Sequence, residues 1–574
     1  MAAGSWSSFA HLYHQRTKYD PETLANQGRS LNWDRQPSSY KHYPGGLTYD
    51  LRPYLAPPKR AGLSAADSAS AELSAAALEK SANQEFLARQ FFESIHQPSS
   101  PGEQSVESRQ FWLRLSRLLR GMYGMTARVP RYNLVLRSAP SAGGLYPTEV
   151  YVLSRGTLDL PAGIYNYQAR SHGLVRCDEE PGFAANGWTQ IREACFWHPA
   201  LDDTQLAIAT TAIFFRSVWR YEDRGYRRIC LDMGHVLGNL ELAAALTDFR
   251  PHCLGTFDDE AVDNLLGLDR EAEGTLAIAA LADLQNQDQY LPLTPTALPM
   301  PVCSFDEQDE GVATGELWRE LHQRSCWLAG STPGAPSGGA TENGETYGRS
   351  RLMTEAAQPG KDKYNFPFGD RHRVTASPLL WGKDLIGLEH AILTRRSTRK
   401  YNGAPINMDQ LFAILQFTYQ PQRYVDQGLD SYPDYFALEA IETFVTITAV
   451  DGLEPGCYYY APHAQELRQI RFKLFKEELH YLALYQDLAR DAAAVVFQTA
   501  NLGQAIERWG DRAYRYLHMD SGHLGQRLSL AAERLGLGAS GIAGFFDDQV
   551  NTLLDIPFDE VVLYLTTLGI KSNG

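Results

Sequence analysis

The sequence predicts an α+β fold that is present twice in one chain, because long segments recur in the same order. The clearest repeat pairs RGYRRICLDMGHVLGNLELAAA, which begins at Arg224, with RAYRYLHMDSGHLGQRLSLAAE, which begins at Arg512, at an offset of 288 residues. On either side, AGIYNYQARSHGLVR is matched by PGCYYYAPHAQELRQ, and FDDEAVDNLLGL by FDDQVNTLLDI. We therefore expect two similar units that form a covalent pseudo-dimer.

Each unit mixes strand and helix patterns. Strands are predicted at 149–153, 443–450 and 560–568, where apolar and β-branched residues dominate. The two Asp-x-Gly-His segments are predicted to open long helices, since leucine and alanine recur there at helical spacing. Asn407, followed three residues later by Gln410, is typical of a capping box at a helix start.

Composition shifts predict the domain division of the 574-residue chain. We expect a first domain at 1–300, a linker at 301–365 and a second domain at 366–574. The linker prediction depends on the Gly-, Ser-, Thr- and Pro-rich stretch at 330–348, which buries too little apolar surface to order itself. An Ala- and Ser-rich stretch at about 61–86 is interpreted as an insertion within the first domain.

Composition and charge exclude several classes of protein. No apolar run reaches the roughly 18 residues of a membrane span, and the N-terminus does not resemble a secretion signal. Seven cysteines without a CxxC pair argue against a disulfide framework or a thiolate metal site. The net charge of -15 disfavours nucleic acid and anionic membranes as partners. We expect a cytoplasmic protein without a metal site.

The segment LTRRSTRKY, at 393–401, is the candidate anion site. Its basic residues Arg395, Arg396 and Arg399 surround Ser397, and guanidinium groups with a hydroxyl suit a phosphate monoester. A solvated basic loop is the alternative. In the first unit, residues 31–45 contain only widely spaced basic residues, so the two units differ in this feature.

The segment RSAPSAGGLYPTEVYV, at 137–152, has a feature that only the first unit contains, whereas the basic motif occurs only in the second. Small residues and glycines precede a strand pattern, which predicts exposed backbone amides that could face a flat polar heterocycle. An ordinary tight loop is the alternative. The counterpart in the second unit has Asp434, Tyr435 and Phe436 at this place.

Arg220 and Tyr221 are the candidate proton-transfer pair, because a cation beside a phenol lowers the pKa of that phenol. An aromatic-rich helix surface is the alternative. The second unit has Arg508 and Trp509 there, so it lacks the phenol. His235 and His523 occur in both units, which favours a structural role at a helix start over catalysis.

Other motifs argue against several enzyme classes. GLGASG, at 536–541, matches GxGxxG, but it follows a helical pattern and not a strand, so a Rossmann dinucleotide site is not expected. HExxH, GxSxG and P-loop motifs do not occur, which disfavours zinc peptidases, serine hydrolases of that type and P-loop NTPases.

Taken together, RSAPSAGGLYPTEVYVL, AGIYNY, YRRICLDMGHVLGNL, FDDEAVDNLLGL and RRSTRKY resemble the nitroreductase superfamily, specifically its SagB/ThcOx-type dehydrogenases. The resemblance implies an FMN site shared between two nitroreductase-like domains. It implies that the phosphate is held by Arg395, Arg396, Ser397, Arg399 and Lys571. It places Gly544 near the reactive edge of the flavin, and it implies ring contacts from Arg137, Pro140, Ser141, Ala142 and Gly143.

We therefore expect an FMN-dependent dehydrogenase or oxidase of natural-product biosynthesis that acts on a peptide-like or azoline-type heterocyclic substrate. Arg220 stands where related azoline dehydrogenases have a lysine, so Tyr221 is expected to carry the proton transfer. The alternatives are an NAD(P)H-dependent nitro or quinone reductase, although Ala543 replaces the carboxylate typical of such enzymes, and a non-catalytic scaffold for a biosynthetic partner. The mirror-image site is expected to be weak or empty, and a further homodimer is left open.

Overall fold

The computed structural model describes residues 8–26, 30–55, 105–178, 182–327 and 362–572, with short gaps at 44, 130–133, 179–181, 287–288, 290–294, 304, 306, 365–368 and 558. The predicted insertion at about 61–86 and the Gly- and Pro-rich stretch at 330–348 lie outside the described residues.

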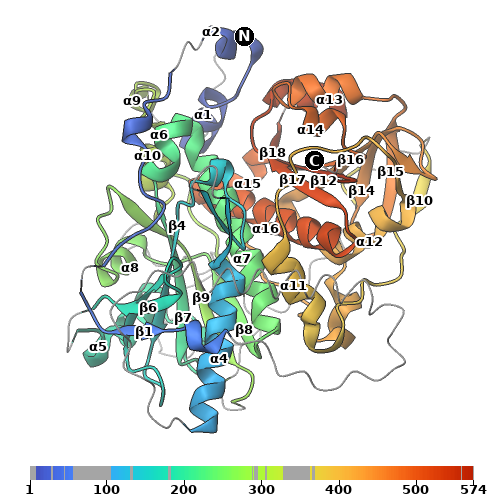
Figure 1. Ribbon diagram of the computed structural model, residues 1–574. Coiled ribbons are helices and arrows are strands. Elements are labelled where there is room, and N and C mark those ends of the chain that lie inside the picture. The colour runs from blue at the N-terminus through green and yellow to red at the C-terminus, as the bar shows by residue number, and fades with distance from the viewer. Residues whose placement is uncertain are drawn as a thin grey trace, which may run out of the picture.

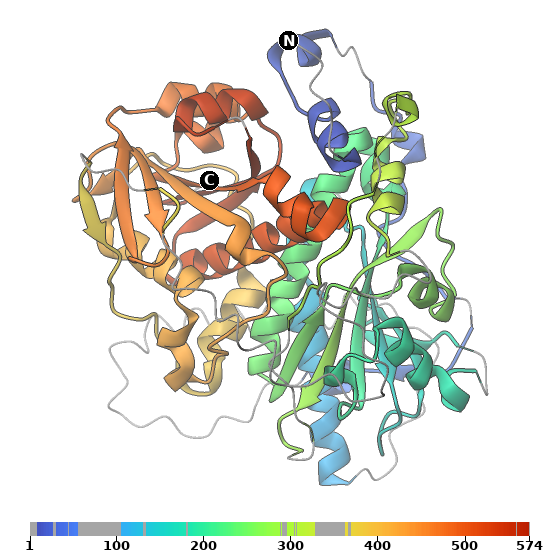
Figure 2. The same ribbon diagram turned by 180° about the vertical axis from the view of Figure 1, so that it is seen from behind.

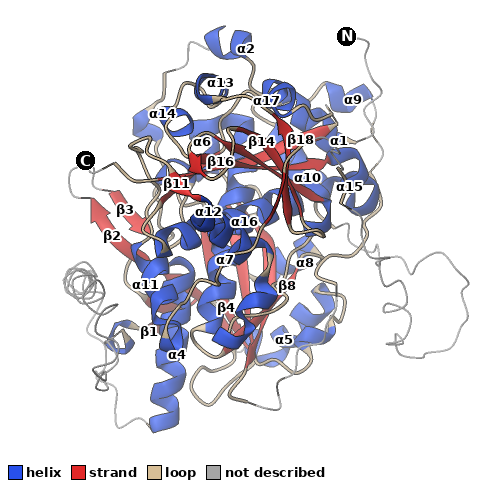
Figure 3. Cartoon of the chain, turned by 90° about the vertical axis from the view of Figure 1, so that its right-hand side faces the viewer, coloured by secondary structure: helices blue, strands red, loops and turns tan. Residues whose placement is uncertain are grey.

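The chain forms two seven-stranded antiparallel sheets, one from each repeat (Figure 1, Figure 3), and the order of the strands is the same in both. The first runs β1 (Thr48–Asp50), β6 (Gly173–Arg176), β5 (Gly163–Gln168), β4 (Thr148–Ser154), β7 (Leu206–Ile213), β9 (Glu273–Asp283), β8 (Phe249–Leu254). The second runs β10 (Arg371–Arg373), β15 (Glu466–Arg471), β14 (Gly456–Ala461), β12 (Ile441–Ile447), β16 (Ala494–Asn501), β18 (Glu560–Gly569), β17 (Gly538–Ile542). The predicted α+β fold in two copies is confirmed.

The three predicted strands correspond to β4, β12 and β18. Strand β12 ends three residues before the predicted end, because the chain bends at Thr448, whose hydroxyl donates to the Ala493 carbonyl over 3.1 Å. The capping box is confirmed: the Asn407 side chain accepts from the Gln410 amide and the Gln410 side chain from the Asn407 amide.

Helices cover these sheets. In the first copy they include α4 (Val106–Tyr123), α5 (Gly182–Ala194), α6 (Phe215–Tyr221), α7 (Gly225–Ala245) and α8 (Asp259–Leu265). In the second they include α11 (Ile386–Thr394), α12 (Met408–Tyr419), α13 (Lys476–Leu482), α15 (Leu502–Trp509), α16 (Ala513–Arg534) and α17 (Asp547–Leu554).

The long helices α7 and α16 pack against each other between the two lobes (Figure 1, Figure 2). At their crossing the backbones touch: a Cβ on Gly234 would lie 1.9 Å from the Met519 carbonyl oxygen, and one on Gly522 2.1 Å from the Leu231 oxygen. The repeated glycine of Asp-x-Gly-His is therefore required by close helix packing. The motif lies in the middle of each helix, which corrects the prediction that it opens the helix.

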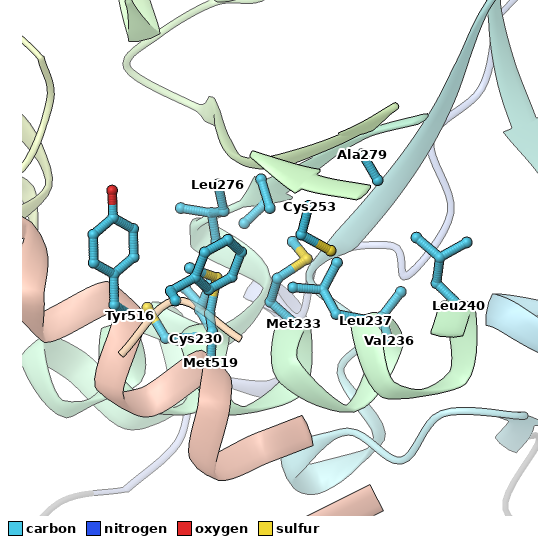
Figure 4. Close-up of a cluster of buried hydrophobic side chains, with 14 of the residues drawn as sticks. Cys230, Met233, Val236, Leu237, Leu240, Cys253, Leu276, Ala279, Tyr516 and Met519 are labelled. Atoms are coloured by element: carbon cyan, nitrogen blue, oxygen red, sulfur yellow. The ribbon is translucent and has the colours of Figure 1, made fainter. Parts of the chain in front are cut away.

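The apolar face of α7 packs on the first sheet (Figure 4). Met233, Leu237 and Leu240 are buried against a sheet surface that includes Cys253 of β8 and Ala279 of β9. Met519 of α16 belongs to the same cluster, so the hydrophobic core is continuous across the two copies.

Two short helices, which we call arms, each precede one copy in the sequence. Helix α1 (Phe9–Arg16) contains His-Gln-Arg at 14–16, and α10 (Leu317–Arg324) contains the same tripeptide at 322–324. The start of each arm is held by an equivalent aspartate: Asp511 accepts from the Ala10 amide over 2.8 Å, and Asp223 accepts from the Gly315 amide over 2.6 Å.

The arms end against equivalent arginines. Arg227 donates to the His14 carbonyl over 2.8 Å, as Arg515 does to the His322 carbonyl over 2.9 Å. Helix α10 lies inside the range predicted as a linker and contacts both copies. The division at 300 and 366 stays a prediction.

The helices of the described residues include none that is long and apolar enough to cross a membrane. The seven cysteines are free thiols, and five of them are buried.

Candidate active site

The basic motif follows α11 and runs beside the edge strand of the second sheet. Ser397 forms a parallel bridge with Ala539 of β17, and the Thr398 amide donates to the Ala539 carbonyl over 2.9 Å. An antiparallel bridge between Tyr401 and Lys571 brings the chain end to the same place. Residues that are far apart in sequence thus form one basic edge.

Arg395 is the buried member of this motif. Its side chain reaches the other copy, where Nε and Nη2 both lie 3.4 Å from the Ser138 carbonyl oxygen. Burial, together with the neighbouring Arg396 guanidinium, lowers the pKa of Arg395 to about 10. Among the described residues no carboxylate oxygen lies within 4.0 Å of it. A buried guanidinium without a carboxylate partner is suited to an anionic ligand.

The other predicted phosphate ligands have different surroundings. Lys571 forms an ion pair with Glu533 at 2.7 Å. Arg396 donates to backbone carbonyls, including that of Thr126 in the other copy over 3.2 Å. Arg399 is exposed. The motif is therefore assembled, and one nearby carboxylate, Glu533, balances part of its charge.

The Pro-Ser loop of the first copy follows β3 (Leu134–Arg137) and is anchored to α7. The Ser141 hydroxyl donates to Asp232 over 2.6 Å, and the Ala142 amide donates to the same carboxylate over 3.0 Å. Burial raises the pKa of Asp232 to about 7. Gly143 is exposed and has a φ of 65°, a conformation that favours glycine.

At least four amides between Ser138 and Leu145 are used within the protein, so fewer are open than predicted. Besides Ala142, the Ser138 amide donates to the Gly124 carbonyl over 2.9 Å, the Gly144 amide to the Ser141 carbonyl over 2.9 Å and the Leu145 amide to the Ala142 carbonyl over 3.4 Å. Pro140 is partly exposed and precedes these residues. The exposed backbone of the loop is therefore concentrated at Gly143.

Arg137 lies behind the loop. Its guanidinium carbon is 4.3 Å from the ring centre of Tyr123 and 4.9 Å from that of Tyr146, and Nη2 donates to the Ser39 carbonyl over 2.7 Å. Tyr146 in turn donates its amide to the Ser141 hydroxyl over 2.9 Å. These contacts favour a supporting role for Arg137 over the direct ring contact that we predict.

Tyr221 meets the loop at its exposed glycine. A Cβ on Gly143 would lie 2.7 Å from the Tyr221 hydroxyl and 3.3 Å from Nη1 of Arg220. The guanidinium carbon of Arg228 lies 4.0 Å from the Tyr221 ring centre, and that of Arg220 lies 5.5 Å away. The predicted proton-transfer pair and the Pro-Ser loop are therefore in contact.

The second copy contributes bare backbone at the end of β17. Gly541 is the exposed position of this strand, and a Cβ on it would lie 1.6 Å from the Tyr564 hydroxyl. Nε2 of His235 holds that hydroxyl at 2.9 Å from across the copy boundary. Gly544 follows, and a Cβ on it would lie 3.6 Å from Nη2 of Arg228.

Sequence reasoning missed several residues of this site. Asp232, Arg228, Gly541 and Tyr564 were not singled out, although the first two lie within the repeat and Gly541 within GLGASG. That motif follows helix α16, as expected, and its residues from Gly538 to Gly541 form most of strand β17. A comparison of the two repeats gives one signal: Arg228 and Gly541 are replaced in the other copy by Tyr516 and Cys253.

The mirror-image position is filled by side chains. Asp520 accepts from the Phe436 and Ala437 amides, as Asp232 does from Ala142. The ring of Phe436 stacks on that of Tyr516, with ring centres 5.3 Å apart. Arg250, at the place that matches Gly538, forms an ion pair with Asp434 at 3.1 Å. Aromatic rings and an ion pair thus occupy this place.

A surface hollow of about 720 Å³ lies elsewhere, between α5 and α8 of the first copy. Its lining includes Asp178, Asn186 and Glu193 and none of the predicted site residues. Within the described part of the chain, no group of three or more His, Cys, Asp or Glu side chains could hold a metal ion.

The chain is a two-copy α+β protein in which the basic motif of one copy lies against the Pro-Ser loop of the other. A family model described as the Nitroreductase family matches residues 114–282 and 392–570. The chain belongs to the Nitroreductase family, with one matched region in each copy.

Known proteins agree with this assignment. A crystal structure of a protein from Anabaena variabilis described as a nitroreductase is 48% identical, with a TM-score of 0.81, and the match covers 98% of this chain and 100% of that one. A Methanocaldococcus jannaschii protein described as a nitroreductase is 32% identical over 186 residues, which cover 32% of this chain and 92% of the relative. The microcin B17-processing protein McbC of Escherichia coli is 28% identical over 167 residues, 28% of this chain and 59% of McbC.

Proposed function

We propose that the chain is an FMN-dependent oxidoreductase, a dehydrogenase or oxidase, with one flavin site per chain. The observation that carries the proposal is the contact of Arg395 with the Ser138 carbonyl. It joins the basic motif of one copy to the Pro-Ser loop of the other. Neither copy has both features, so their meeting supports a shared site.

The residues present suit FMN. The buried guanidinium of Arg395 suits the phosphate, and Arg396, Ser397, Arg399 and Lys571 lie along the same edge. Gly143 and Gly541 are exposed, which leaves backbone on which a flat ring could rest, and the hydroxyls of Tyr221 and Tyr564 lie close beside them. Pro140, Ser141, Ala142 and Gly544 are proposed to complete the ring contacts.

Bound FMN supplies a two-electron acceptor for hydride. We assign to Tyr221 the removal of the accompanying substrate proton, since its hydroxyl is placed at Gly143. Arg220 is assigned a positioning role next to this phenol, since a guanidinium is a poor proton shuttle. Asp232 holds the loop in place.

The proposed substrate is peptide-like or heterocyclic and belongs to natural-product biosynthesis. This part follows from the similarity to McbC and to the trifolitoxin-processing protein TfxB of Rhizobium leguminosarum, both 28% identical. The chain matches 59% and 38% of their lengths, so the substrate class is inferred from partial matches.

An absorption spectrum of the purified chain tests the proposal. We expect a flavin spectrum with one FMN per chain, and Arg395→Met is expected to lose most of the flavin. Arg508→Met, at an exposed site, serves as the matched control. A colourless chain that binds no added FMN would overturn the proposal. Flavin that is bleached by NAD(P)H but not by peptide-like candidates would instead favour a reductase.

A further inference from the structure

Arg228 is a buried guanidinium at the centre of the composite site. It lies in the first turn of α7 and is 6% exposed. Nη1 lies 3.3 Å from the Arg224 carbonyl oxygen and Nη2 lies 3.5 Å from the Tyr19 hydroxyl, which are both long contacts for hydrogen bonds. Its hydrogen-bonding capacity is therefore poorly used.

The charges around Arg228 do not balance. Its neighbours Arg224 and Arg227 share one carboxylate, Asp547, at 2.7 and 2.8 Å. Asp232, one turn further along α7, forms its hydrogen bonds with the Pro-Ser loop, and burial raises its pKa although the Arg228 charge acts in the opposite direction. Within the described residues no carboxylate oxygen lies within 4.0 Å of Arg228. A buried cation without a carboxylate in contact is costly, and an anionic ligand would offset that cost.

The second copy shows that the fold does not need an arginine here. Tyr516 occupies the matching position of α16, where its hydroxyl donates to the Gly255 carbonyl over 2.7 Å. The two arginines before it in the repeat are present in both copies. In the second copy Arg512 and Arg515 share Asp259. In the first copy Arg224 and Arg227 share Asp547 in the same way. The arginine at 228 is thus particular to the composite site.

Arg228 also faces the parts of the site that the proposed chemistry uses. Tyr221 and Gly544 both lie close to the Arg228 guanidinium. The half-buried Tyr19, in the segment that follows helix α1, is a third neighbour. Although burial alone would raise it, the Arg228 and Arg224 guanidiniums bring the pKa of Tyr19 below its ordinary value. The Tyr19 hydroxyl is therefore a good hydrogen-bond donor beside Arg228.

We propose that Arg228, with Tyr19 and Tyr221 around it, binds a carboxylate group of the substrate. A planar guanidinium forms two parallel hydrogen bonds with a carboxylate, and a phenol can add a third. The proposal rests on the proposed function, because it places the carboxylate beside the same site. It narrows the substrate class to molecules that carry an anionic group near the carbon that is oxidised.

Benzoate and benzamide are the probes, since they differ in charge but little in shape. Titration of the holoenzyme, followed by the flavin absorption spectrum, is expected to give at least tenfold tighter binding of benzoate. Arg228→Gln is expected to weaken benzoate binding at least tenfold and to leave benzamide binding unchanged, while Arg228→Lys restores part of it. Arg508→Gln is the matched control.

Two further measurements keep the test decisive. If Arg228→Gln does not fold, Arg228→Tyr copies the residue that the second copy already has at this position. Calorimetry with benzoate on the flavin-free chain separates this proposal from the proposed function, because loss of FMN binding alone does not remove Arg228. Equal binding of the two probes, no binding of either, or benzoate binding that ignores residue 228 would overturn the proposal.

Discussion

At the scale of the residue, the proposed composite site is marked by two exposed glycines, which have no side chain. Gly541 is exposed in an otherwise buried stretch of β17, and Gly143 is exposed in the Pro-Ser loop. In the mirror-image position Cys253 replaces Gly541, and aromatic side chains fill the space. The two places therefore differ both in the glycine and in the aromatic side chains around it.

Gly541→Ala is expected to displace Tyr564, because the new Cβ would lie 1.6 Å from its hydroxyl. We expect a loss of about 1 to 3 kcal/mol of unfolding free energy and weaker FMN binding, measured by urea unfolding and flavin titration. The double variant Gly541→Ala with Tyr564→Phe removes the clashing oxygen and is expected to recover part of both. Flavin affinity unchanged in the single variant contradicts the assignment of this surface.

Tyr221→Phe is expected to retain FMN and to slow flavin reduction by substrate about 100-fold or more, since it removes the proposed proton acceptor. Stopped-flow absorbance measures the rate. Tyr432→Phe, at an exposed tyrosine, is the control and is expected to leave the rate unchanged. Full-speed reduction in the Tyr221 variant rules out its proposed role.

At the scale of the element, the fold depends on how α7 and α16 cross and on where the arms attach. The crossing requires Gly234 and Gly522, and the arms are fixed by Asp223 and Asp511. Both devices occur twice, so they belong to the duplicated scaffold and not to the chemistry.

Gly234→Ala is expected to destabilise the chain by about 3 kcal/mol or more, because its Cβ would lie 1.9 Å from a backbone oxygen that cannot move without the whole helix. Gly503→Ala is the matched control: its Cβ would come no closer than 3.4 Å to another atom, and a small gain is expected. Chemical unfolding of the two variants compares them. Equal stability of both variants contradicts the close crossing.

The sequence was informative wherever a pattern was long. The 288-residue repeat predicted the two copies, and the cap at Asn407 and the strands were found from local chemistry. The arms were missed because His-Gln-Arg is too short to stand out and the repeat offset changes there. Gly541 and Arg228 were missed because only the packing shows what a side chain there would touch.

At the scale of the whole molecule, buried titratable groups set the pH dependence. Burial lowers the pKa of His235 and His518 to about 3, so the unfolded chain binds protons below pH 6.5 that the folded chain does not. Burial raises the pKa of Asp232 to about 7 and that of Asp520 to about 8, so the folded chain holds protons that the unfolded chain has lost. The two effects have opposite signs.

We therefore expect these four groups to give stability that changes little between about pH 4 and pH 6.5 and falls above pH 6.5. In the first interval the two histidines and the two aspartates offset each other, whereas above it only the aspartates contribute, until the pH passes their folded pKa values. Urea unfolding at pH 5, 6.5 and 8.5 measures the curve. Asp520→Asn is expected to flatten the alkaline side, whereas the exposed Asp451→Asn leaves it unchanged. An alkaline slope that survives Asp520→Asn contradicts this account.

The covalent joining of the two copies has a consequence for how the protein can change over generations. In a homodimer the two subunits are identical, so every substitution appears in both of them. A substitution that improves a position in one subunit therefore also changes the matching position in the other subunit. In this chain Arg228 and Tyr516 are separate positions, so each can change without the other. The first copy can therefore change towards the proposed ligand recognition, while the matching position of the second copy is packed with side chains. Neither copy is constrained by the effect that the same substitution would have in the other.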